Sequence, residues 1–348
     1  MSRLVVGALL GALALSVAAC GGAEEPPAAT PTPAADPLGG RSLYVDPVSP
    51  AALEAAEAEG EGRYAEADDF ATIAAQPVAT WFSGQQADPY AAAEELTSAA
   101  AEADQLPVLV VYNRPQRDCG QFSAGGASDA QAYYDWLGAL SAGIGGRPAL
   151  VVLEPDAVSH ALQGCGTGES PESTYALLTT AVDILGEQAR TQVFVDAGHA
   201  GWVEDLEELA QALRESGATR AAGFALNTSN FQSTEDSLAY GERLSALLDG
   251  APYVVDTSRN GNGAPAGVDD GDVDAWCNPP GRALGDSPTT ATGSPSAVAF
   301  LWVKQPGNSD GACRDGEPEA GAWWPEYARE LVRNRHGAAA SSAHQVSG

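Results

Sequence analysis

Basic residues are scarce in this chain, and lysine is almost absent. Only 17 Lys and Arg residues stand against 47 Asp and Glu residues among the 348, which gives a formal net charge of −30. A chain of this charge would repel a phosphate backbone, so nucleic acid is excluded as a partner and a neutral or cationic one is favoured. The single lysine, Lys304, lies in an apolar segment six residues before Asp310, and we expect it to have a positioned role.

Sequence patterns for metals and dinucleotides are also missing. Neither a C-x-x-C nor a C-x-x-H spacing occurs, which argues against a zinc site. The acidic stretch 269–274 lacks the glutamate that closes a calcium loop at its twelfth position, so a solvated turn is expected there. The glycines at 261–263 precede a proline and acidic residues instead of a helix, which argues against a dinucleotide site. We therefore expect a protein that needs no metal and no cofactor.

No internal repeat and no low-complexity linker interrupts the middle of the chain. The length and a hydrophobic content of 44% are sufficient for a full core. One folded domain is predicted over residues 37–336, followed by an unstructured tail over residues 337–348. We expect the protein to be a monomer.

The N-terminus has the pattern of an export signal. Arg3 is followed by an apolar stretch over residues 4–19 and then by Cys20. The segment 17–20 (VAAC) resembles a bacterial lipobox, in which the cysteine is lipidated and becomes the mature N-terminus. Residues 1–20 are thus predicted to be a lipoprotein-type signal peptide, with an ordinary cleaved signal as the alternative. Residues 21–36, rich in Pro, Ala, Glu and Thr, are predicted to be a flexible tether. The protein is expected at the cell surface, anchored through Cys20, or secreted.

Four strand-like apolar runs are each followed by an aspartate. The runs cover residues 108–112, 149–153, 193–195 and 299–303, and the aspartates are Asp118, Asp156, Asp196 and Asp310. Buried runs separated by helix-length segments predict a parallel sheet flanked by helices. In α/β barrels the polar residues at the C-terminal ends of the strands form the active site. The sequence therefore predicts an α/β barrel enzyme that works with carboxylates, and a hydrolase fits best.

The folded domain contains four cysteines, Cys119, Cys165, Cys277 and Cys313. An even number in an exported chain indicates two disulfides, and three pairings are possible. The sequential pairing, Cys119 with Cys165 and Cys277 with Cys313, closes two local loops of similar size. Its first bridge would fix the loop after Asp118, and its second would fix the loop that carries Asp310.

Six segments of the chain resemble, in the same order, those of glycoside hydrolase family 6, the cellulases that comprise endoglucanases and cellobiohydrolases. The resemblance extends from about residue 38 to residue 334, and the segments are 112–126 (YNRPQRDCGQFSAGG), 153–156 (LEPD), 196–202 (DAGHAGW), 227–231 (NTSNF), 276–281 (WCNPPG) and 302–311 (WVKQPGNSDG). The resemblance implies a distorted barrel of seven parallel strands, with the active-site cleft at their C-terminal ends. It also implies hydrolysis of β-1,4-glucosidic bonds with inversion of configuration.

The resemblance assigns a role to each aspartate. Inversion needs one carboxylic acid that protonates the leaving oxygen and a base that activates water on the opposite face of the sugar. Asp156 matches the acid, and Asp118 matches the carboxylate that raises its pKa. Asp310 matches the residue that is either the base or a stabiliser of the positively charged transition state, and Asp196 a supporting carboxylate. Tyr112 matches the tyrosine beside the sugar at the cleavage point.

Each aspartate also has a purely structural interpretation. Asp118 would pair only with Arg117, Asp156 would cap a helix, and the other two would occupy turns. Their joint position at strand ends, beside their matching neighbours, favours the site interpretation.

Further residues match the sugar contacts of the family, because pyranose rings stack on aromatic faces while their hydroxyls bind polar groups. Trp202 would line a subsite on the leaving-group side, and Trp81 and Trp276 would line the other side. The matching polar contacts are Lys304, His199, Asn230 and, for the catalytic water, Ser123.

Two positions depart from the family pattern. Asn308 stands where the family commonly has Glu, and Val298 where it commonly has Asp. The spans between the paired cysteines are short, which favours an open cleft and endo action on a β-1,4-glucan. The alternatives are a cellobiohydrolase of the same family and a surface lipoprotein that binds glucan without cutting it.

Overall fold

The computed structural model describes residues 38, 40–164, 170–268 and 272–345. The predicted signal peptide, its Cys20 and the tether lie outside these residues, and so do Cys165 and part of the acidic stretch 269–274. Within the described residues, no helix is both long and apolar enough to cross a membrane.

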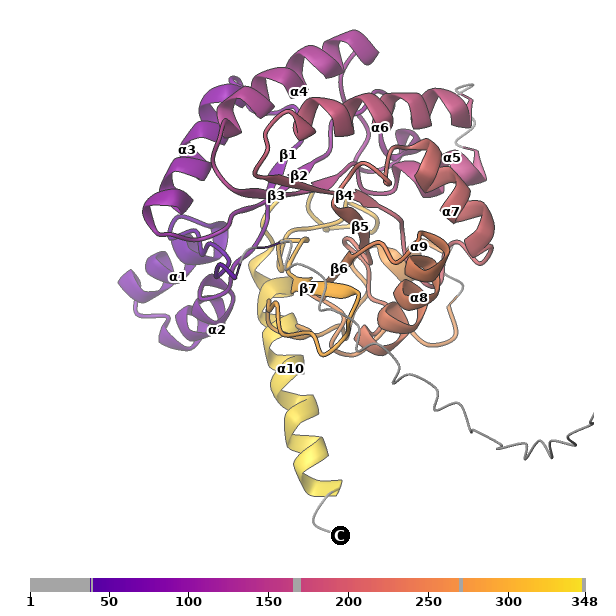
Figure 1. Ribbon diagram of the computed structural model, residues 1–348. Helices are drawn as coiled ribbons and strands as arrows, with labels where there is room; N and C mark the ends of the chain where they lie inside the picture. The colour runs from indigo at the N-terminus through magenta and orange to yellow at the C-terminus, as the bar shows by residue number, and fades with distance from the viewer. Residues whose placement is uncertain (1–37, 39, 165–169, 269–271, 346–348) are drawn as a thin grey trace, which may run out of the picture. The chain divides into compact units, whose positions relative to one another are not determined.

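Seven parallel strands form one sheet whose spatial order equals the chain order, which confirms the predicted fold (Figure 1). The strands are β1 (Thr80–Phe82), β2 (Val108–Val111), β3 (Ala149–Leu153), β4 (Thr191–Asp196), β5 (Gly223–Leu226), β6 (Tyr253–Asp256) and β7 (Ala297–Leu301). The sheet curls until its edges meet just before β1 and just after β7. There Val78 pairs with Trp302 in an isolated parallel bridge, and the N–H of Ala79 donates to the Trp302 carbonyl at 3.0 Å. The result is a distorted barrel.

The strands read as continuous apolar runs because both of their faces are covered. In β3, Leu150 and Val152 point into the barrel, whereas the residues between them face the helices. Phe194 and Val254 fill the same interior from other strands. The interior is therefore a packed core, and the site must lie at one end of the barrel.

Helices flank the sheet and connect its strands (Figure 1). Their bounds are α1 (Pro50–Gly60), α2 (Tyr64–Ala74), α3 (Pro89–Glu102), α4 (Ala130–Ile144), α5 (Ala157–Gln163), α6 (Pro171–Gly186), α7 (Leu206–Glu215), α8 (Thr234–Leu247), α9 (Val273–Trp276) and α10 (Pro325–Gln345), with a 3₁₀ turn, η1, at Asp118–Gly120. Ser or Asp side chains that accept backbone N–H groups start several of them, as at Asp88 before α3 and Asp205 before α7. Each such cap fixes where a strand-to-helix loop ends.

Helix α10 passes the boundary at residue 336 that the sequence predicted for the folded domain. It continues to Gln345, so helix is found over most of the predicted tail. The segment after Gly337 is rich in alanine, the residue with the highest helix propensity, which explains the continuation.

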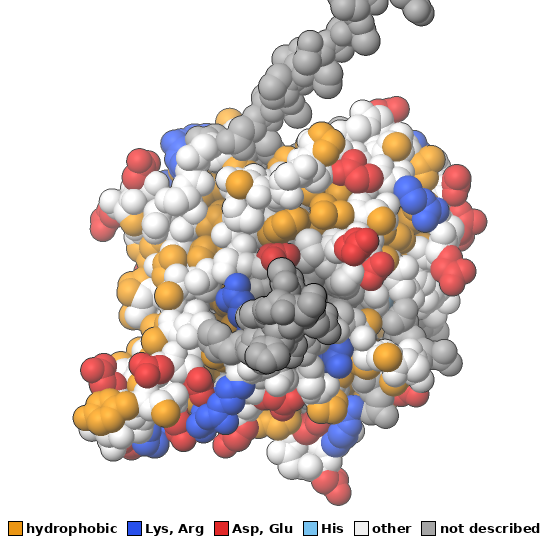
Figure 2. Space-filling view, turned by 90° about the horizontal axis from the view of Figure 1, so that it is seen from below, with side chains coloured by type: hydrophobic (Ala, Val, Ile, Leu, Met, Phe, Trp, Pro, Cys, Tyr) orange, Lys and Arg blue, Asp and Glu red, His pale blue; other side chains and the backbone are white. Residues whose placement is uncertain are grey.

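Charged side chains of both signs are visible on the face of the molecule seen in Figure 2, and they do not form one large patch there. On the face shown in Figure 2, acidic and basic side chains alternate around the rim.

Candidate active site

A cavity of about 800 Å³ lies at the C-terminal end of the barrel. The loops that follow the strands supply its walls, as expected for a parallel barrel. Its lining includes the predicted site residues Trp81, Tyr112, Asp118, Ser123, Asp156, His199, Trp202, Asn230, Trp276, Lys304 and Asp310. Asp196 is the one predicted carboxylate that does not line it, because its side chain is buried behind the cavity wall, with 1% exposed.

Asp156 lies just before α5 and has a left-handed backbone, with φ of 70°. Its side chain makes no capping hydrogen bond, so the interpretation of Asp156 as a mere helix cap is wrong. The backbone N–H of Asp156 donates to Asp196 Oδ1 at 2.9 Å. Burial, together with the charges of Asp196 and Asp118, raises the pKa of Asp156 well above its ordinary value. A carboxyl group with a raised pKa keeps its proton to higher pH than an ordinary aspartate does, as a general acid requires.

Asp196 lies behind the cavity wall, next to the backbone of Asp156. It is the last residue of β4, and its Oδ1 also accepts the N–H of Gly198 at 3.0 Å. Burial raises the pKa of Asp196 to about 6 although these hydrogen bonds oppose the shift. Asp196 is therefore outside the cavity lining and in direct contact with the backbone of Asp156.

Asp118 sits in η1, on the loop after β2. Its Oδ2 accepts the N–H of Ser123 at 2.6 Å, and burial raises the pKa of Asp118 against the opposing charge of Arg117. The Arg117 guanidinium donates to three carbonyls, those of Ser123 (2.7 Å), Tyr112 (2.7 Å) and Ser83 (2.6 Å). Arg117 therefore fixes the conformation of the loop through these carbonyls. Asp118 in turn binds the backbone of Ser123, so a pairing with Arg117 alone does not describe it.

Asp310 has the opposite electrostatic environment. Arg259 donates to both of its oxygens, at 2.8 and 3.0 Å, and Lys304 Nζ lies 2.9 Å from Oδ1. The N–H of Asn278 donates to Oδ2 at 3.0 Å. Burial alone would raise the pKa of Asp310, but Arg259 and Lys304 outweigh it and the pKa is lowered. The same cavity thus contains one carboxyl group whose pKa is lowered, Asp310, and one whose pKa is raised, Asp156.

Aromatic side chains form the flat parts of the cavity wall. Trp81 meets Tyr112 edge to face at a centroid distance of 5.5 Å, and its Nε1 donates to the Val303 carbonyl at 2.8 Å. Trp202 packs against His199 at 5.6 Å, and Trp276 against Phe122 at 6.0 Å. These contacts fix the planes of the rings that the sequence predicted to bind sugar.

The structure adds residues that the sequence interpretation missed. Arg259 is fully buried beside Asp310, yet 51 positions separate the two in the chain, so no local motif reveals the pair. His160 lines the cavity one turn after Asp156 and contacts Trp202 at 5.0 Å. Asp256 ends β6, and its run Tyr-Val-Val-Asp has the same pattern as the segment ending at Asp196, so that pattern could have found it.

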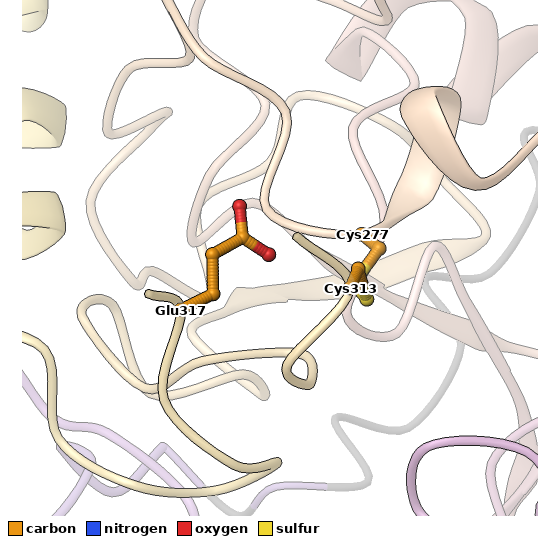
Figure 3. Close-up of side chains that lie close together, drawn as sticks. All are labelled: Cys277, Cys313 and Glu317. Atoms are coloured by element: carbon orange, nitrogen blue, oxygen red, sulfur yellow. A yellow bond between two sulfur atoms is a disulfide. The ribbon is translucent and has the colours of Figure 1, made fainter. Parts of the chain in front are cut away.

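The predicted pair Cys277–Cys313 is a disulfide. Cys119 is also disulfide-bonded, whereas its predicted partner Cys165 lies outside the described residues. Cys277, Cys313 and Glu317 are the one group within the described ranges whose spacing would suit a metal ion, but the two sulfurs are bonded to each other (Figure 3). Glu317 instead accepts from Asn278 Nδ2 at 3.1 Å and from Arg314 Nη1 at 3.0 Å, which ties the bridge to the Asp310 loop.

Comparison with known proteins agrees with this geometry. The family model for glycosyl hydrolases family 6 matches residues 38–335. Endoglucanase A of Cellulomonas fimi is 43% identical over 264 residues, which cover 75% of this chain and 55% of that protein. Endoglucanase 1 of Streptomyces halstedii is 40% identical over 314 residues, which cover 88% of this chain and 93% of that protein. The chain thus spans about half of the first relative and nearly all of the second.

A solved structure extends the likeness to three dimensions. The endoglucanase Cel6 of Mycobacterium tuberculosis was determined in complex with methyl-cellobiosyl-4-deoxy-4-thio-β-D-cellobioside. It matches with a TM-score of 0.79 and 40% identity, over 87% of this chain and 100% of that one. The likeness therefore covers most of this chain and the whole of that one.

Proposed function

The chain belongs to glycosyl hydrolases family 6, and from that premise we propose that it hydrolyses β-1,4-glucosidic bonds in cellulose or related β-glucans, within the polymer and with inversion. One observation carries the proposal: Asp156 and Asp310 line the same cavity. Burial and neighbouring carboxylates raise the pKa of Asp156, whereas two cations lower the pKa of Asp310. An acid and an anion that differ in this way are what an inverting glycosidase requires.

In the proposed reaction, Asp156 donates its proton to the glycosidic oxygen as the bond to the anomeric carbon breaks. Asp118 and Asp196 keep that proton on Asp156 until the leaving oxygen takes it, because a second negative charge nearby would be unfavourable. A water molecule attacks from the opposite face of the ring and loses a proton as the new bond forms. The product then has the α configuration.

Asp310 is proposed to stabilise the positive charge of the transition state. Its oxygens already accept hydrogen bonds from Arg259, Lys304 and Asn278, and its lowered pKa makes it a weak base. A fixed anion of this kind needs no reorganisation when the oxocarbenium charge develops. The proton of the attacking water would then leave through solvent in the cavity.

Substrate binding follows from the aromatic walls. We propose that Trp202 binds the sugar on the leaving-group side and that Trp81 and Trp276 bind the sugars on the other side. The structure of the related Cel6 contains a thio-linked cello-oligosaccharide, which supports this class of ligand. Endo action is supported by the two relatives named endoglucanases that are at least 40% identical to this chain.

The proposal is tested by product analysis on cello-oligosaccharides of increasing length. We expect internal cleavage and, by proton NMR of the earliest product, the α-anomer. Asp156→Ala should abolish cleavage while binding of the oligosaccharide persists. Release of cellobiose alone would point to a cellobiohydrolase, and binding without turnover by the wild-type protein would leave only a glucan-binding role.

Export of the protein and its attachment through a lipid on Cys20 remain proposals that rest on the N-terminal sequence pattern. The Cys277–Cys313 disulfide supports an oxidising compartment, where such bridges persist. Mass spectrometry of the mature protein from a lipoprotein-exporting bacterial host would show either an acylated Cys20 or an unmodified cleaved N-terminus.

A further inference from the structure

Asp256 is a buried carboxylate that accepts four backbone N–H groups. It is the last residue of β6, and 1% of its surface is exposed. Its Oδ1 accepts the N–H groups of Ser258 at 2.9 Å and Val303 at 3.2 Å. Its Oδ2 accepts those of Ser229 and Lys304, both at 2.9 Å. Both oxygens are therefore occupied, and Asp256 is not among the residues that line the cavity.

The four N–H groups belong to three different loops of the site. Ser229 follows β5, and Ser258 follows β6 and directly precedes Arg259 in the chain. Val303 and Lys304 follow β7. One carboxylate thus joins the C-terminal ends of three neighbouring strands at a fixed spacing. Two of these loops carry the cations Arg259 and Lys304, which bind Asp310.

We propose that Asp256 is a positioning residue for Asp310. It holds the backbone at Lys304 and at the residue before Arg259, and in this way sets where the two cations meet the Asp310 carboxylate. The inference rests on the proposed function, because it concerns how the anion of that reaction is held. Asp256 itself touches neither the substrate nor Asp310.

The two cations have further contacts near Asp310, and Arg259 also lies over the Phe231 ring at 4.4 Å from its centroid. Lys304 Nζ has one further bond, to the Ser309 carbonyl at 3.1 Å, and this acceptor is the neighbour of Asp310 in the chain. The Arg259 guanidinium also donates to the Ser229 carbonyl, whose own N–H is bound by Asp256. The route from Asp256 to Asp310 therefore passes through both cations.

A distinctive consequence follows for the pH dependence of the reaction. The charged groups nearest Asp310 are Arg259 and Lys304, with Asp256 behind them, and Tyr327 approaches from α10. Burial raises the pKa of Tyr327, so it stays neutral. If the cations shift, burial is no longer outweighed, and the pKa of Asp310 rises. The acidic limb of the kcat profile would then move to higher pH.

The test uses Asp256→Asn in the full chain. The asparagine has the same shape as the aspartate, but its NH₂ group replaces one of the two oxygens. Two backbone N–H groups then face a donor instead of an acceptor and must move away from it. We expect kcat on a soluble cello-oligosaccharide to fall about tenfold or more, since small displacements of catalytic groups cost this much. KM should stay within about threefold, because the aromatic walls that are proposed to bind the sugars are retained. The acidic limb should move to higher pH.

Glu242→Gln is the matched control. Glu242 on α8 accepts hydrogen bonds from Ser296 Oγ at 3.0 Å and from Tyr253 OH at 3.2 Å, at the opposite end of β6 and β7. Its substitution should lower the melting temperature but leave kcat and the pH profile unchanged. A role of Asp256 in fold stability alone would make the two variants behave alike.

Each outcome decides the inference. Wild-type kcat and an unshifted acidic limb in folded Asp256→Asn would overturn it, and so would an equal loss of kcat in Glu242→Gln. If Asp256→Asn does not fold, Asp256→Ser, which leaves room for water among the N–H groups, replaces it. Failure of both to fold would also contradict the proposal, since Asp256 would then serve the fold. A wild-type protein without turnover would instead reject the proposed function.

Discussion

The backbone N–H of Asp156 donates to the buried Oδ1 of Asp196 at 2.9 Å, so the proposed acid is attached to the carboxylate that ends the next strand. This contact joins the ends of β3 and β4 across the parallel ladder. It also brings the charge of Asp196 close enough to raise the pKa of Asp156. A single hydrogen bond thus links the register of the sheet to the protonation of the acid.

As pH is raised, the Asp196→Asn variant should lose its activity at a lower pH than the wild type does. The negative charge of Asp196 raises the pKa of Asp156, so its removal lowers that pKa. Asp156 would then lose its proton earlier as pH increases, and the alkaline limb of kcat/KM would move down. The pH profile on a soluble cello-oligosaccharide measures this shift. Asp183→Asn, at an exposed ion pair with Arg220, is the control and should leave the limb unchanged.

Arg259→Met should be one of the most destabilising single changes at this end of the barrel. It leaves the buried Asp310 with only Lys304 as a cationic partner, and breaking a buried pair costs about 3–5 kcal/mol. The unfolding free energy from urea denaturation measures the loss. Arg220→Met breaks the exposed pair with Asp183 and should cost less than about 1 kcal/mol. Equal losses in the two variants would contradict the electrostatic account of Asp310.

The double variant Cys277→Ser, Cys313→Ser should be less stable and less active than the wild type. The bridge closes a loop with a sequence separation of 36, for which chain entropy gives about 3–4 kcal/mol. Cys277 precedes Asn278, whose Oδ1 accepts the N–H of Asp310 at 2.7 Å, so kcat should fall as well. Urea denaturation and kcat of the variant measure both effects. A variant with lower stability but wild-type kcat would show that the bridge does not position Asp310.

The sequence could predict a parallel barrel because four apolar runs are each followed by an aspartate, whereas the number of seven strands was implied by the resemblance to the family. The same pattern predicted that Asp118, Asp156 and Asp310 lie close together, and the three line one cavity. It could not place Arg259, because nothing local to that residue shows that its guanidinium reaches a carboxylate 51 positions away. The helix beyond residue 336 was also missed, since a polar, alanine-rich segment has the composition of a tail as well as that of an exposed helix.

The tryptophans on opposite sides of the proposed cleavage point should shift the products in opposite directions. Trp202→Ala removes a ring on the leaving-group side, so a labelled cello-oligosaccharide should bind with fewer sugars there. Trp81→Ala removes a ring on the other side and should move the cut the opposite way. Each ring should contribute about 1–3 kcal/mol to binding, by analogy with nucleic-acid bases that stack on aromatic side chains. Chromatography of the labelled fragments measures the positions of the cuts. The two variants control for each other, and an identical shift in both would show that the rings serve packing and not separate subsites.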